Sequence, residues 1–449
     1  MRSRNVSLSG WGLYPRVDCD LVRPSSLSDV RALYDNGATV VPRGLGRSYA
    51  DQAINAGGCV ADLTGLDRYR DFDPATGRLT CEAGVSLEKI LDDFAPRGFM
   101  PMITPGTKFV TIGGCIANDI HGKAHHADGC FSRCTESFRI TLANGETVNA
   151  SPDENADLYW ANFGGLGLLG VITEATIRLR KVETTYFDQT AVECEDLDAM
   201  LDALDEYNHL PYSVAWVDSL ATGAKLGRGV LTVGDHLKAA DLPAKYKKEP
   251  LRVSPPSPIA VPFPLPSATL NTATIRLANV VLDQVQKHGA AVAHYEKFFY
   301  PLDAIGDWNL GYGARGFTQY QFVIPMKDGR KNIRELMETI ATCGQAPFLN
   351  VLKRFGPERP ETQLSFPFEG YTFAIDFPVR DGLPEVLRKL DERVLQMGGR
   401  IYLGKDAFLG RDMFEQMYPK LAEWKAVKAK YDPDGKLSSN IGRRLGLSA

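Results

Sequence analysis

Several features that would place the chain in common functional classes are missing from its sequence. No stretch approaches the ~18 consecutive apolar residues of a membrane-spanning helix, and the Arg-containing N-terminus lacks the apolar core of a secretory signal. Basic residues are not in excess, since 51 Lys and Arg stand against 55 Asp and Glu, for a net charge of −4. We therefore expect no nucleic-acid partner.

Cysteine is also sparse and unpatterned. The 8 cysteines form no CxxC pair, so we expect no disulfide framework, and reduced thiols in a cytoplasm fit better. His121, His125 and His126 are close in sequence, but no HExxH or CxxC pattern accompanies them, and Gly122 indicates a tight turn. We expect no metal site, and a solvated polar loop for His125 and His126.

What the sequence does contain is the length and composition of a multi-domain globular enzyme. The 449 residues are 44% hydrophobic and 24% charged, enough for two or more domains. Up to residue 184, short strands alternate with helices and glycine loops. We expect strands at 38–42, 79–85 and 171–179, and helices that begin after Ser26 and Ser86. This pattern predicts an α+β fold.

The later part of the chain is less regular. Residues 250–266 are too rich in proline for a helix or a central strand, and form either a rigid surface loop or a mobile lid. Apolar residues share one face of an expected helix at 383–395, and residues 428–444 indicate a basic, turn-rich tail. Tyr320 and Phe322 are expected in the core.

Two glycine-rich segments carry the strongest chemical signal. The first covers residues 43–49 after an expected strand, and the second covers 105–107 and 111–122. Small residues let consecutive backbone N–H groups form a concave anion site, to which Arg43 and Arg47 add charge. Two such loops suit a diphosphate-bridged dinucleotide; simple strand connections are the alternative. Neither loop is a GxGxxG or GxxxxGK[ST] motif, which disfavours Rossmann and nucleotide-triphosphatase folds.

These loops resemble a known family. PRGLGRSYAD (42–51) and PGTKFVTIGGCIANDIHGK (105–123) are similar to the flavin-binding domain of the vanillyl-alcohol-oxidase type, and within it to the decaprenylphosphoryl-β-D-ribose oxidases, the flavin subunits of polyprenyl-phosphoribose epimerases. Similar blocks at 213–229, 298–325, 348–357, 374–383 and 400–408 extend the resemblance over nearly the whole chain. It implies a two-domain flavoprotein: an FAD-binding domain at 1–184, a substrate-binding domain with an antiparallel sheet at 185–399, and a return to the first domain at 400–449.

The resemblance implies FAD as the cofactor. The expected contacts are Arg43, Gly44, Leu45, Gly46, Arg47, Ser48 and Tyr49 in the first loop, Pro105, Gly106, Thr107, Thr111, Gly113, Gly114, Ala117, Asn118, Asp119, His121 and Gly122 in the second, and Ile172, Tyr402 and Lys405 elsewhere. Many relatives tether the flavin through a histidine in the first loop. That place is Arg47 here, so we expect non-covalent FAD, with hydride acceptance as the cofactor's own chemistry.

The resemblance also implies catalytic and substrate-binding residues. Lys405, His121 and Tyr49 are expected at the reaction centre, where Lys405 or His121 positions or accepts a hydroxyl proton. The expected substrate contacts are Lys123, Trp216, Tyr312, Gln319, Gln321, Lys353 and Ala374. Ala374 departs from the best-known relatives, which carry a cysteine there, but hydride transfer needs no thiol.

Three functions are compatible with these residues. The first is oxidation of the 2′-hydroxyl of a polyprenyl-phosphoryl-β-D-ribofuranose, followed by reduction on a separate NAD(P)H-dependent short-chain reductase to give the arabinose form used in the cell wall. This lipid substrate would bring a cytoplasmic enzyme to the inner membrane surface, with the proline-rich segment or nearby apolar residues at the entrance. The second is oxidation of a soluble sugar, alditol or aldonolactone, and the third is a non-enzymatic flavin-binding or sensor role.

Overall fold

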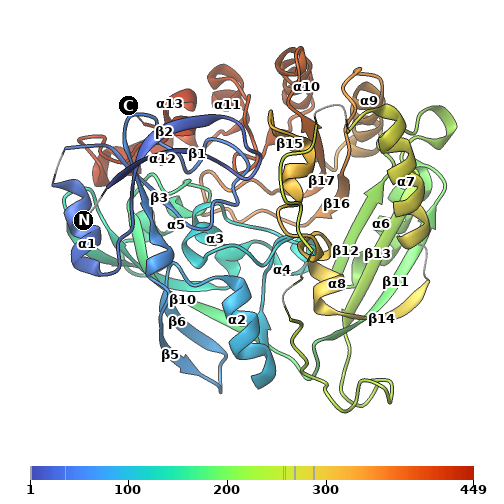
Figure 1. Cartoon of the computed structure of the whole chain (residues 1–449), viewed down its shortest axis with the longest axis horizontal. Helices are drawn as coiled ribbons and strands as arrows, with labels where there is room; N and C mark the ends of the chain where they lie inside the picture. The colour runs from blue at the N-terminus through green and yellow to red at the C-terminus, as the bar shows by residue number, and fades with distance from the viewer. Residues whose placement is uncertain are drawn as a thin grey trace.

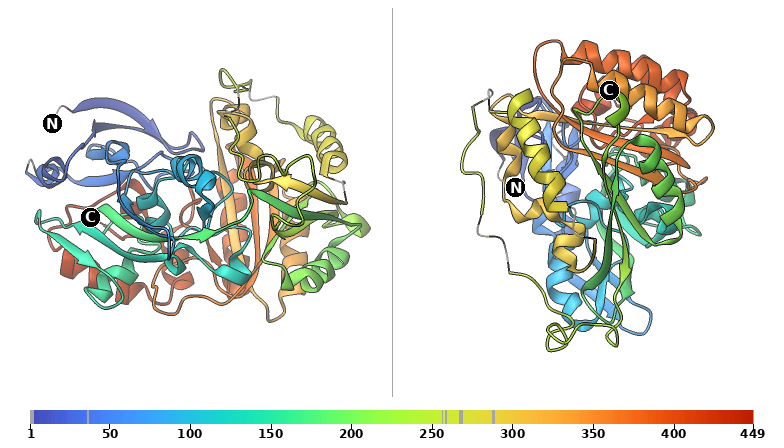
Figure 2. Two further views of the ribbon diagram at one scale, coloured as in Figure 1. Left: turned by 90° about the horizontal axis from the view of Figure 1, so that it is seen from below. Right: turned by 90° about the vertical axis from the view of Figure 1, so that its right-hand side faces the viewer.

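The computed structural model of the protein describes residues 3–35, 37–255, 257, 259–266, 269–286 and 289–448. Strands in these residues form sheets of four, six and eight strands. The two smaller sheets and the last helices of the chain occupy one half of the molecule, and the eight-stranded sheet occupies the other (Figure 1; Figure 2, left). This mixture of helices and sheets confirms the predicted α+β fold.

The four-stranded sheet carries the first glycine loop at the end of a strand. Its order is β1-β2-β4-β3, with bounds Arg4–Ser9, Arg16–Val22, Cys59–Asp62 and Val40–Arg43. β3 pairs in parallel with β4 and is buried at Val40 and Val41, so the loop that follows begins from a fixed strand. Ser26 caps α1 (Leu27–Arg31) by accepting a hydrogen bond from the Asp29 amide at 3.2 Å.

The six-stranded sheet supports the second glycine segment. Its strands are β5 (Tyr69–Asp73), β6 (Arg78–Glu82), β7 (Phe99–Pro101), β8 (Thr135–Thr141), β9 (Thr147–Ala150) and β10 (Val171–Lys181). The predicted helix after Ser86 is confirmed as α2 (Leu87–Phe94), whose apolar face joins the core of this sheet. The other helices here are α3 (Ile112–Ala117), α4 (His125–Asp128) and α5 (Ala156–Asn162).

The eight-stranded sheet is antiparallel and has two different faces. Its order is β14-β11-β13-β12-β16-β17-β15-β18, with bounds Ala290–His294, Tyr186–Cys194, Gly229–His236, Tyr212–Val217, Asn350–Phe355, Gly370–Pro378, Phe317–Pro325 and Arg400–Ile401. One face packs against α6 (Leu197–Glu206), α9 (Gly329–Ala341) and α10 (Leu383–Gln396). Tyr320 and Phe322 are buried on that face, as predicted. Because side chains alternate along a strand, Gln319 and Gln321 point to the other face.

α7 (Thr272–Gln286) and the proline-rich segment both lie near the eight-stranded sheet. α7 lies on the opposite side of the sheet from α6 (Figure 2), and α8 (Tyr295–Phe299) follows β14. Residues 250–255, 257 and 259–266 contain no helix or strand apart from a bridge between Ala260 and Gly306. Pro256 and Pro258 of this segment lie outside the described residues.

Within the described part of the chain, no helix is long and apolar enough to cross a bilayer.

The C-terminal residues pack beside the N-terminal sheets. The Val40 amide donates to the Lys436 carbonyl at 2.7 Å, and the Trp424 indole donates to the Ala161 carbonyl at 3.0 Å. The predicted turn-rich tail at 428–444 is wrong in part, because it contains the end of α12 (Leu421–Tyr431) and most of α13 (Asn440–Leu445), which follow α11 (Arg411–Met417). The division at residues 184 and 399 stays a prediction.

Candidate functional site

The two glycine segments pack closely against neighbouring backbone and side-chain atoms. A Cβ atom on Gly44 would lie 2.1 Å from Thr111 Oγ1, so the first segment rests on the second. A Cβ atom on Gly122 would lie 2.0 Å from the Thr104 carbonyl oxygen. Glycine is therefore required at both positions by close approach.

The two arginines of the first loop have different environments. The Arg43 guanidinium donates to the Ser9 carbonyl at 2.8 Å and to the Ala53 carbonyl at 3.1 Å, so it supports the loop instead of standing free for a phosphate. The Arg47 guanidinium lies on the Trp11 ring, 3.8 Å from the ring centroid. Its Nε atom is buried and has no hydrogen-bond partner within the described residues. Arg47 therefore offers an unsatisfied hydrogen-bond donor. It stands at the position where, by the family resemblance, many related flavoproteins carry a histidine.

Asn118 and Asp119 lie at the end of α3. The Asn118 amide donates to the Gly114 carbonyl at 3.0 Å, while its Oδ1 atom is buried without a partner in the described part of the chain. The buried Asp119 carboxylate accepts from the Ser132 amide at 2.9 Å and from the Ser365 hydroxyl at 2.5 Å. Burial outweighs these bonds and raises the pKa of Asp119 to about 6. The Asp119 carboxylate is thus engaged with protein groups, and its contribution to cofactor binding stays a prediction.

One face of the eight-stranded sheet gathers most of the expected substrate residues. Strand alternation and register place on it Trp216 of β12, Gln319 and Gln321 of β15, Lys353 of β16, and Ala374 and Asp376 of β17. Ala374 lies directly opposite Gln321, and Asp376 directly opposite Gln319. We call this surface the site face; sequence analysis identified all of these residues as site candidates except Asp376.

His121 reaches the site face from the second glycine segment. Its Nε2 atom accepts from the Gln321 side-chain amide at 3.1 Å, so Nδ1 carries the ring proton, and Nδ1 has no partner within the described residues. The ring centroid lies 4.9 Å from that of Phe355 and 5.1 Å from that of Tyr402. Burial, reinforced by the charge of Lys353, lowers the pKa of His121 well below its usual value. His121 is therefore a neutral ring whose Nδ1–H can bind an oxygen atom.

Lys405 and Tyr49 come from opposite ends of the chain and meet here. The Lys405 ammonium lies on the Tyr49 ring, 3.6 Å from its centroid, and the Tyr49 amide donates to the Gly404 carbonyl at 3.3 Å. Burial lowers the pKa of Lys405; the carboxylate of Asp376 opposes this effect and the charge of Lys353 adds to it. The sequence-predicted pair is thus brought together.

Two further lysines make the site cationic. The Lys123 ammonium donates to the Phe298 carbonyl and lies 4.8 Å from the centroid of that ring. Burial lowers the pKa of Lys123 to about 7, with the charge of Lys353 contributing. Burial also lowers the pKa of Lys353 to about 8. Protonated lysines in such surroundings favour an anionic ligand, because an anion would restore the lost solvation.

The other predicted residues lie nearby or in the supporting core. The Tyr312 hydroxyl donates to Asp376 at 2.9 Å, and the Tyr402 hydroxyl donates to the Asn118 carbonyl at 3.2 Å. Ile172 is buried in β10, opposite Ile140. The remaining expected cofactor residues lie within the two glycine segments: Leu45, Gly46, Ser48, Pro105, Gly106, Thr107, Gly113 and Ala117.

His125 and His126 are not a solvated polar loop, so that prediction is wrong. His125 is 4% exposed, and its Nδ1 atom accepts from the Gly356 amide at 3.2 Å. Burial, with the charge of Lys353, lowers the pKa of His125 to about 3. His126 is half-buried and bonds through Nε2 to the Leu210 carbonyl at 2.7 Å. Within the residues that the structure describes, no group of His, Cys, Asp or Glu could hold a metal ion.

Sequence reasoning missed the residues that hold Lys405 beside Tyr49. The buried Gln52 amide donates to the Leu403 carbonyl at 2.6 Å and to the Asp406 carbonyl at 2.8 Å. Arg444 forms ion pairs with Asp51 and Asp406, each at 2.9 Å. No local pattern marks these residues, because their partners are distant in sequence. Asp376 had a weak signal, since it alternates with Ala374 in a block that carries the family resemblance.

The residues at the site fit a flavin dinucleotide. Four polar atoms on expected site residues are buried without a partner in the described structure: Arg47 Nε, Asn118 Oδ1, His121 Nδ1 and Trp216 Nε1. Six further atoms of this kind lie on other described residues, so the four are not unique to the site. Because native proteins rarely leave buried polar atoms unpaired, the four at the site fit a ligand with several polar groups. That the backbone N–H groups of the glycine loops hold its diphosphate stays a prediction.

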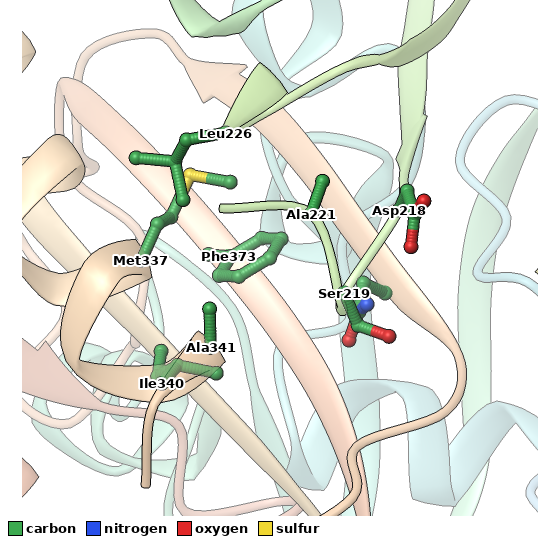
Figure 3. Close-up of a pocket in the computed structure, with 9 residues that line it drawn as sticks. Asp218, Ser219, Ala221, Leu226, Met337, Ile340, Ala341 and Phe373 are labelled. Carbon is green, nitrogen blue, oxygen red and sulfur yellow. The ribbon is translucent and has the colours of Figure 1, made fainter. Parts of the chain in front are cut away.

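Two cavities lie outside the site. The first has a volume of about 10 Å³, room for about one water molecule. It is lined by Asp218, Ser219, Ala221, Leu226, Met337, Ile340, Ala341, Asn350 and Phe373 (Figure 3). The second is a cleft of about 560 Å³ that includes Tyr14, Arg315 and Arg380. Neither lining contains an expected site residue.

Comparison with known proteins agrees with these two halves. A family described as FAD binding domain matches residues 21–151, and one described as D-arabinono-1,4-lactone oxidase matches residues 315–445. The chain is 36% identical to decaprenylphosphoryl-beta-D-ribose oxidase of Mycolicibacterium smegmatis over 453 residues, which cover 98% of this chain and 97% of that protein. It is 23% identical to L-gulono-1,4-lactone dehydrogenase of Mycobacterium tuberculosis over 437 residues, 95% of each chain. The cofactor is therefore FAD, as predicted.

Proposed function

The chain belongs to the decaprenylphosphoryl-β-D-ribose oxidase family, and from this premise we propose that it oxidises the 2′-hydroxyl of a polyprenyl-phosphoryl-β-D-ribofuranose to the 2′-keto sugar. The observation that carries the proposal is the 36% identity over 98% of the chain. The cationic, donor-rich site face supports it, because a phosphoryl sugar offers an anion and several hydroxyls to that surface. The protein is an FAD-dependent oxidoreductase.

The two glycine loops would hold FAD, and the site face would hold the sugar. FAD, when bound, supplies the hydride acceptor at N5, so the carbinol carbon is oxidised while the cofactor is reduced. His121 binds a sugar oxygen through Nδ1–H, because its Nε2 already accepts from Gln321. Lys123 and Lys353 bind the phosphoryl oxygens.

Lys405 takes the hydroxyl proton in this scheme. Its pKa is lowered by burial, so part of the population is a neutral amine near neutral pH. His121 is the weaker candidate, because its pKa is lowered well below the usual value and its acceptor nitrogen is engaged. After the transfer, Lys405 is an ammonium group beside Tyr49, where it would stabilise negative charge on a bound, reduced cofactor.

Anaerobic stopped-flow spectroscopy tests the proposal. Farnesyl-phosphoryl-β-D-ribofuranose should bleach the oxidised flavin absorbance, and the 2′-deoxy analogue, which lacks the reacting hydroxyl, should not. The keto product can be trapped with borodeuteride and identified by mass spectrometry. Bleaching by the 2′-deoxy analogue, or none by the ribose substrate, would overturn the assignment.

A soluble lactone oxidase is the second candidate, because the D-arabinono-1,4-lactone oxidase family matches residues 315–445. In the same experiment, bleaching by D-arabinono-1,4-lactone or L-gulono-1,4-lactone without bleaching by the phosphoryl ribose would select this function. The relative named L-gulono-1,4-lactone dehydrogenase is only 23% identical, which weighs against it.

We propose that FAD is bound without a covalent link. Arg47 stands at the usual attachment position, and a guanidinium that stacks on Trp11 cannot form the histidyl bond. Acid precipitation should leave the yellow colour in the supernatant. A yellow pellet would contradict this reading of Arg47.

We also propose two partners for the reaction: a separate NAD(P)H-dependent short-chain reductase that reduces the ketone, and the inner membrane surface that presents the lipid. Support for the second comes from α7 and the proline-rich segment, which expose large apolar side chains: Ile259, Phe263, Leu277, Val280, Val281 and Val285. Sedimentation with anionic liposomes should carry down the wild type and less of the Leu277→Glu, Val281→Glu double variant. Equal sedimentation of the two would contradict this surface.

A further inference from the structure

Asp376 is a buried carboxylate on the site face that the proposed reaction does not use. It is 0% exposed, accepts from the Gln319 side-chain amide at 2.6 Å, and accepts from the Tyr312 hydroxyl at 2.9 Å. It lies near the end of β17, two residues from Ala374, and β17 belongs to the eight-stranded sheet that stands beside the half with the glycine loops (Figure 1). A buried carboxylate is costly unless it is both hydrogen-bonded and paired with a cation, and the two hydrogen bonds meet only the first of these conditions.

Two sets of contacts bring Lys405 close to Asp376. The Tyr402 amide donates to the Gln321 carbonyl on β15 at 2.8 Å, and the Lys405 amide donates to the Tyr402 carbonyl at 3.1 Å. The Lys405 ammonium lies on the ring of Tyr49, which packs in one buried cluster with Tyr312, the hydrogen-bond partner of Asp376.

The carboxylate of Asp376 on β17 raises the pKa of Lys405, and the ammonium of Lys353 on β16 lowers it. The ring of Tyr49 packs against the Lys405 ammonium. Of these groups, only Asp376 carries a negative charge. His121, the other titratable group nearby, is kept neutral by burial and by the charges of Lys353 and Lys405.

We propose that Asp376 is a positioning residue that sets how firmly Lys405 holds its proton. The inference rests on the role proposed above for Lys405. Burial raises the pKa of Asp376 to about 6, and Tyr312 and Gln319 limit this rise by donating to its two oxygens, so the carboxylate is ionised at neutral pH. The ionised carboxylate stabilises the Lys405 ammonium. Asp376 thereby fixes the pH range in which Lys405 changes from proton acceptor to cation.

The fold provides a matched control on the opposite face of the same sheet. Asp391 of α10 is 3% exposed and accepts from the Tyr320 hydroxyl at 2.9 Å, so it is also a buried carboxylate bonded to a tyrosine. No effect of Asp391 on Lys405 is expected, because Tyr320 points to the helix-covered face. Any effect of general destabilisation should therefore appear in Asp391→Asn as well as in Asp376→Asn.

The test measures the protonation of Lys405 directly. Acetic anhydride acetylates only the neutral amine, so the labelling rate of Lys405 against pH, read by peptide mass spectrometry, gives its midpoint. The measurement is made on the holoprotein and after removal of the flavin. Asp376→Asn should move the midpoint to lower pH by about one unit or more, since the group that raises the pKa of Lys405 is gone. Asp391→Asn should leave the midpoint in place.

A second variant covers the case in which Asp376→Asn does not fold. Tyr312→Phe removes a hydrogen bond that keeps Asp376 ionised, so it should shift the Lys405 midpoint in the same direction by a smaller amount. An unchanged midpoint in the folded Asp376→Asn variant, or in Tyr312→Phe if that variant alone folds, would overturn the inference. So would an equal shift in Asp391→Asn. Because labelling needs no substrate, its outcome is independent of whether the phosphoryl ribose is turned over.

Discussion

Burial decides the charge of the individual residues that line the site. It lowers the pKa of Lys123 to about 7 and that of Lys353 to about 8, and it keeps His121 neutral. Lys123 donates to the Phe298 carbonyl and His121 keeps an Nδ1–H without a partner in the described residues, whereas Asp376 is an acceptor already in use. A ligand rich in oxygen atoms and negative charge therefore satisfies this pocket better than an apolar one.

Lys405 gives the sharpest prediction at this scale. Lys405→Met keeps the apolar stem over Tyr49 but removes the amine, so FAD should remain bound. The rate of flavin reduction by the true substrate should fall ~10²–10³-fold, the usual effect of losing one preorganised charge or proton acceptor. Stopped-flow spectroscopy measures this rate. The exposed Lys389 on α10 provides the control, and Lys389→Met should reduce flavin normally; near-normal reduction in Lys405→Met would make the lysine peripheral.

Ala374 gives a prediction about inhibition. The family resemblance implies that nitroaromatic inactivators are reduced at the flavin to an electrophile that a cysteine at this position captures. Ala374 offers no nucleophile. Cys115, in the second glycine segment, is 0% exposed and its pKa is raised well above the usual value by burial, so it is no substitute. Such compounds should bind reversibly to the wild type, while Ala374→Cys should gain an adduct with modest strain. Intact mass spectrometry after turnover detects the adduct; its presence on the wild type would refute this account.

At the scale of elements, the two glycines Gly106 and Gly122 look alike in sequence but differ in the structure. A Cβ atom on Gly122 would lie 2.0 Å from the Thr104 carbonyl oxygen, whereas one on Gly106 would have no atom within 4 Å. Gly122→Ala should therefore displace the loop, lower the free energy of unfolding by about 1–3 kcal/mol and reduce FAD occupancy. Gly106→Ala should change stability by less than about 0.5 kcal/mol. Thermal unfolding and flavin content of the two variants check this, and equal losses would contradict it.

The helices and strands that were predicted correctly are those whose sequence signals are local. The Ser86 cap that marks α2 and the apolar spacing that marks both α2 and α10 are local features of the sequence, and both helices are confirmed. The alternation of Gln319, Tyr320 and Gln321 likewise places the tyrosine in the core from a few residues. His125 shows the limit of such reasoning, because its burial depends on Gly356 and β16, far along the chain.

At the scale of the whole molecule, the functional site depends on contacts between residues far apart in sequence, which no local pattern reveals. Gln52 bonds to the carbonyls of Leu403 and Asp406, and Arg444 links Asp51 to Asp406. These contacts join the first glycine loop to the segment that carries Lys405. The family resemblance identified Tyr49 and Lys405 as members of one site. Only the tertiary structure identifies the residues that hold these two side chains next to each other.

Arg444 provides the prediction at this largest scale. Its guanidinium lies between Asp51 and Asp406, whose side chains are 6% and 5% exposed, so its loss leaves two buried carboxylates without their cation. Arg444→Met should lower the free energy of unfolding by about 3–5 kcal/mol, because breaking a buried ion pair from one side leaves uncompensated charge. Urea denaturation measures this change. Arg388→Met is the control: its i,i+4 pair with Glu392 is exposed at 66% and 37%, and its loss should cost at most about 0.5 kcal/mol. Because Asp406 follows Lys405 directly, the Arg444→Met variant should also reduce flavin more slowly while it is folded. This second measurement separates a role in the site from a role in stability alone. Equal free energies of unfolding for Arg444→Met and Arg388→Met would show that the C-terminal helices do not hold the Lys405 segment in place.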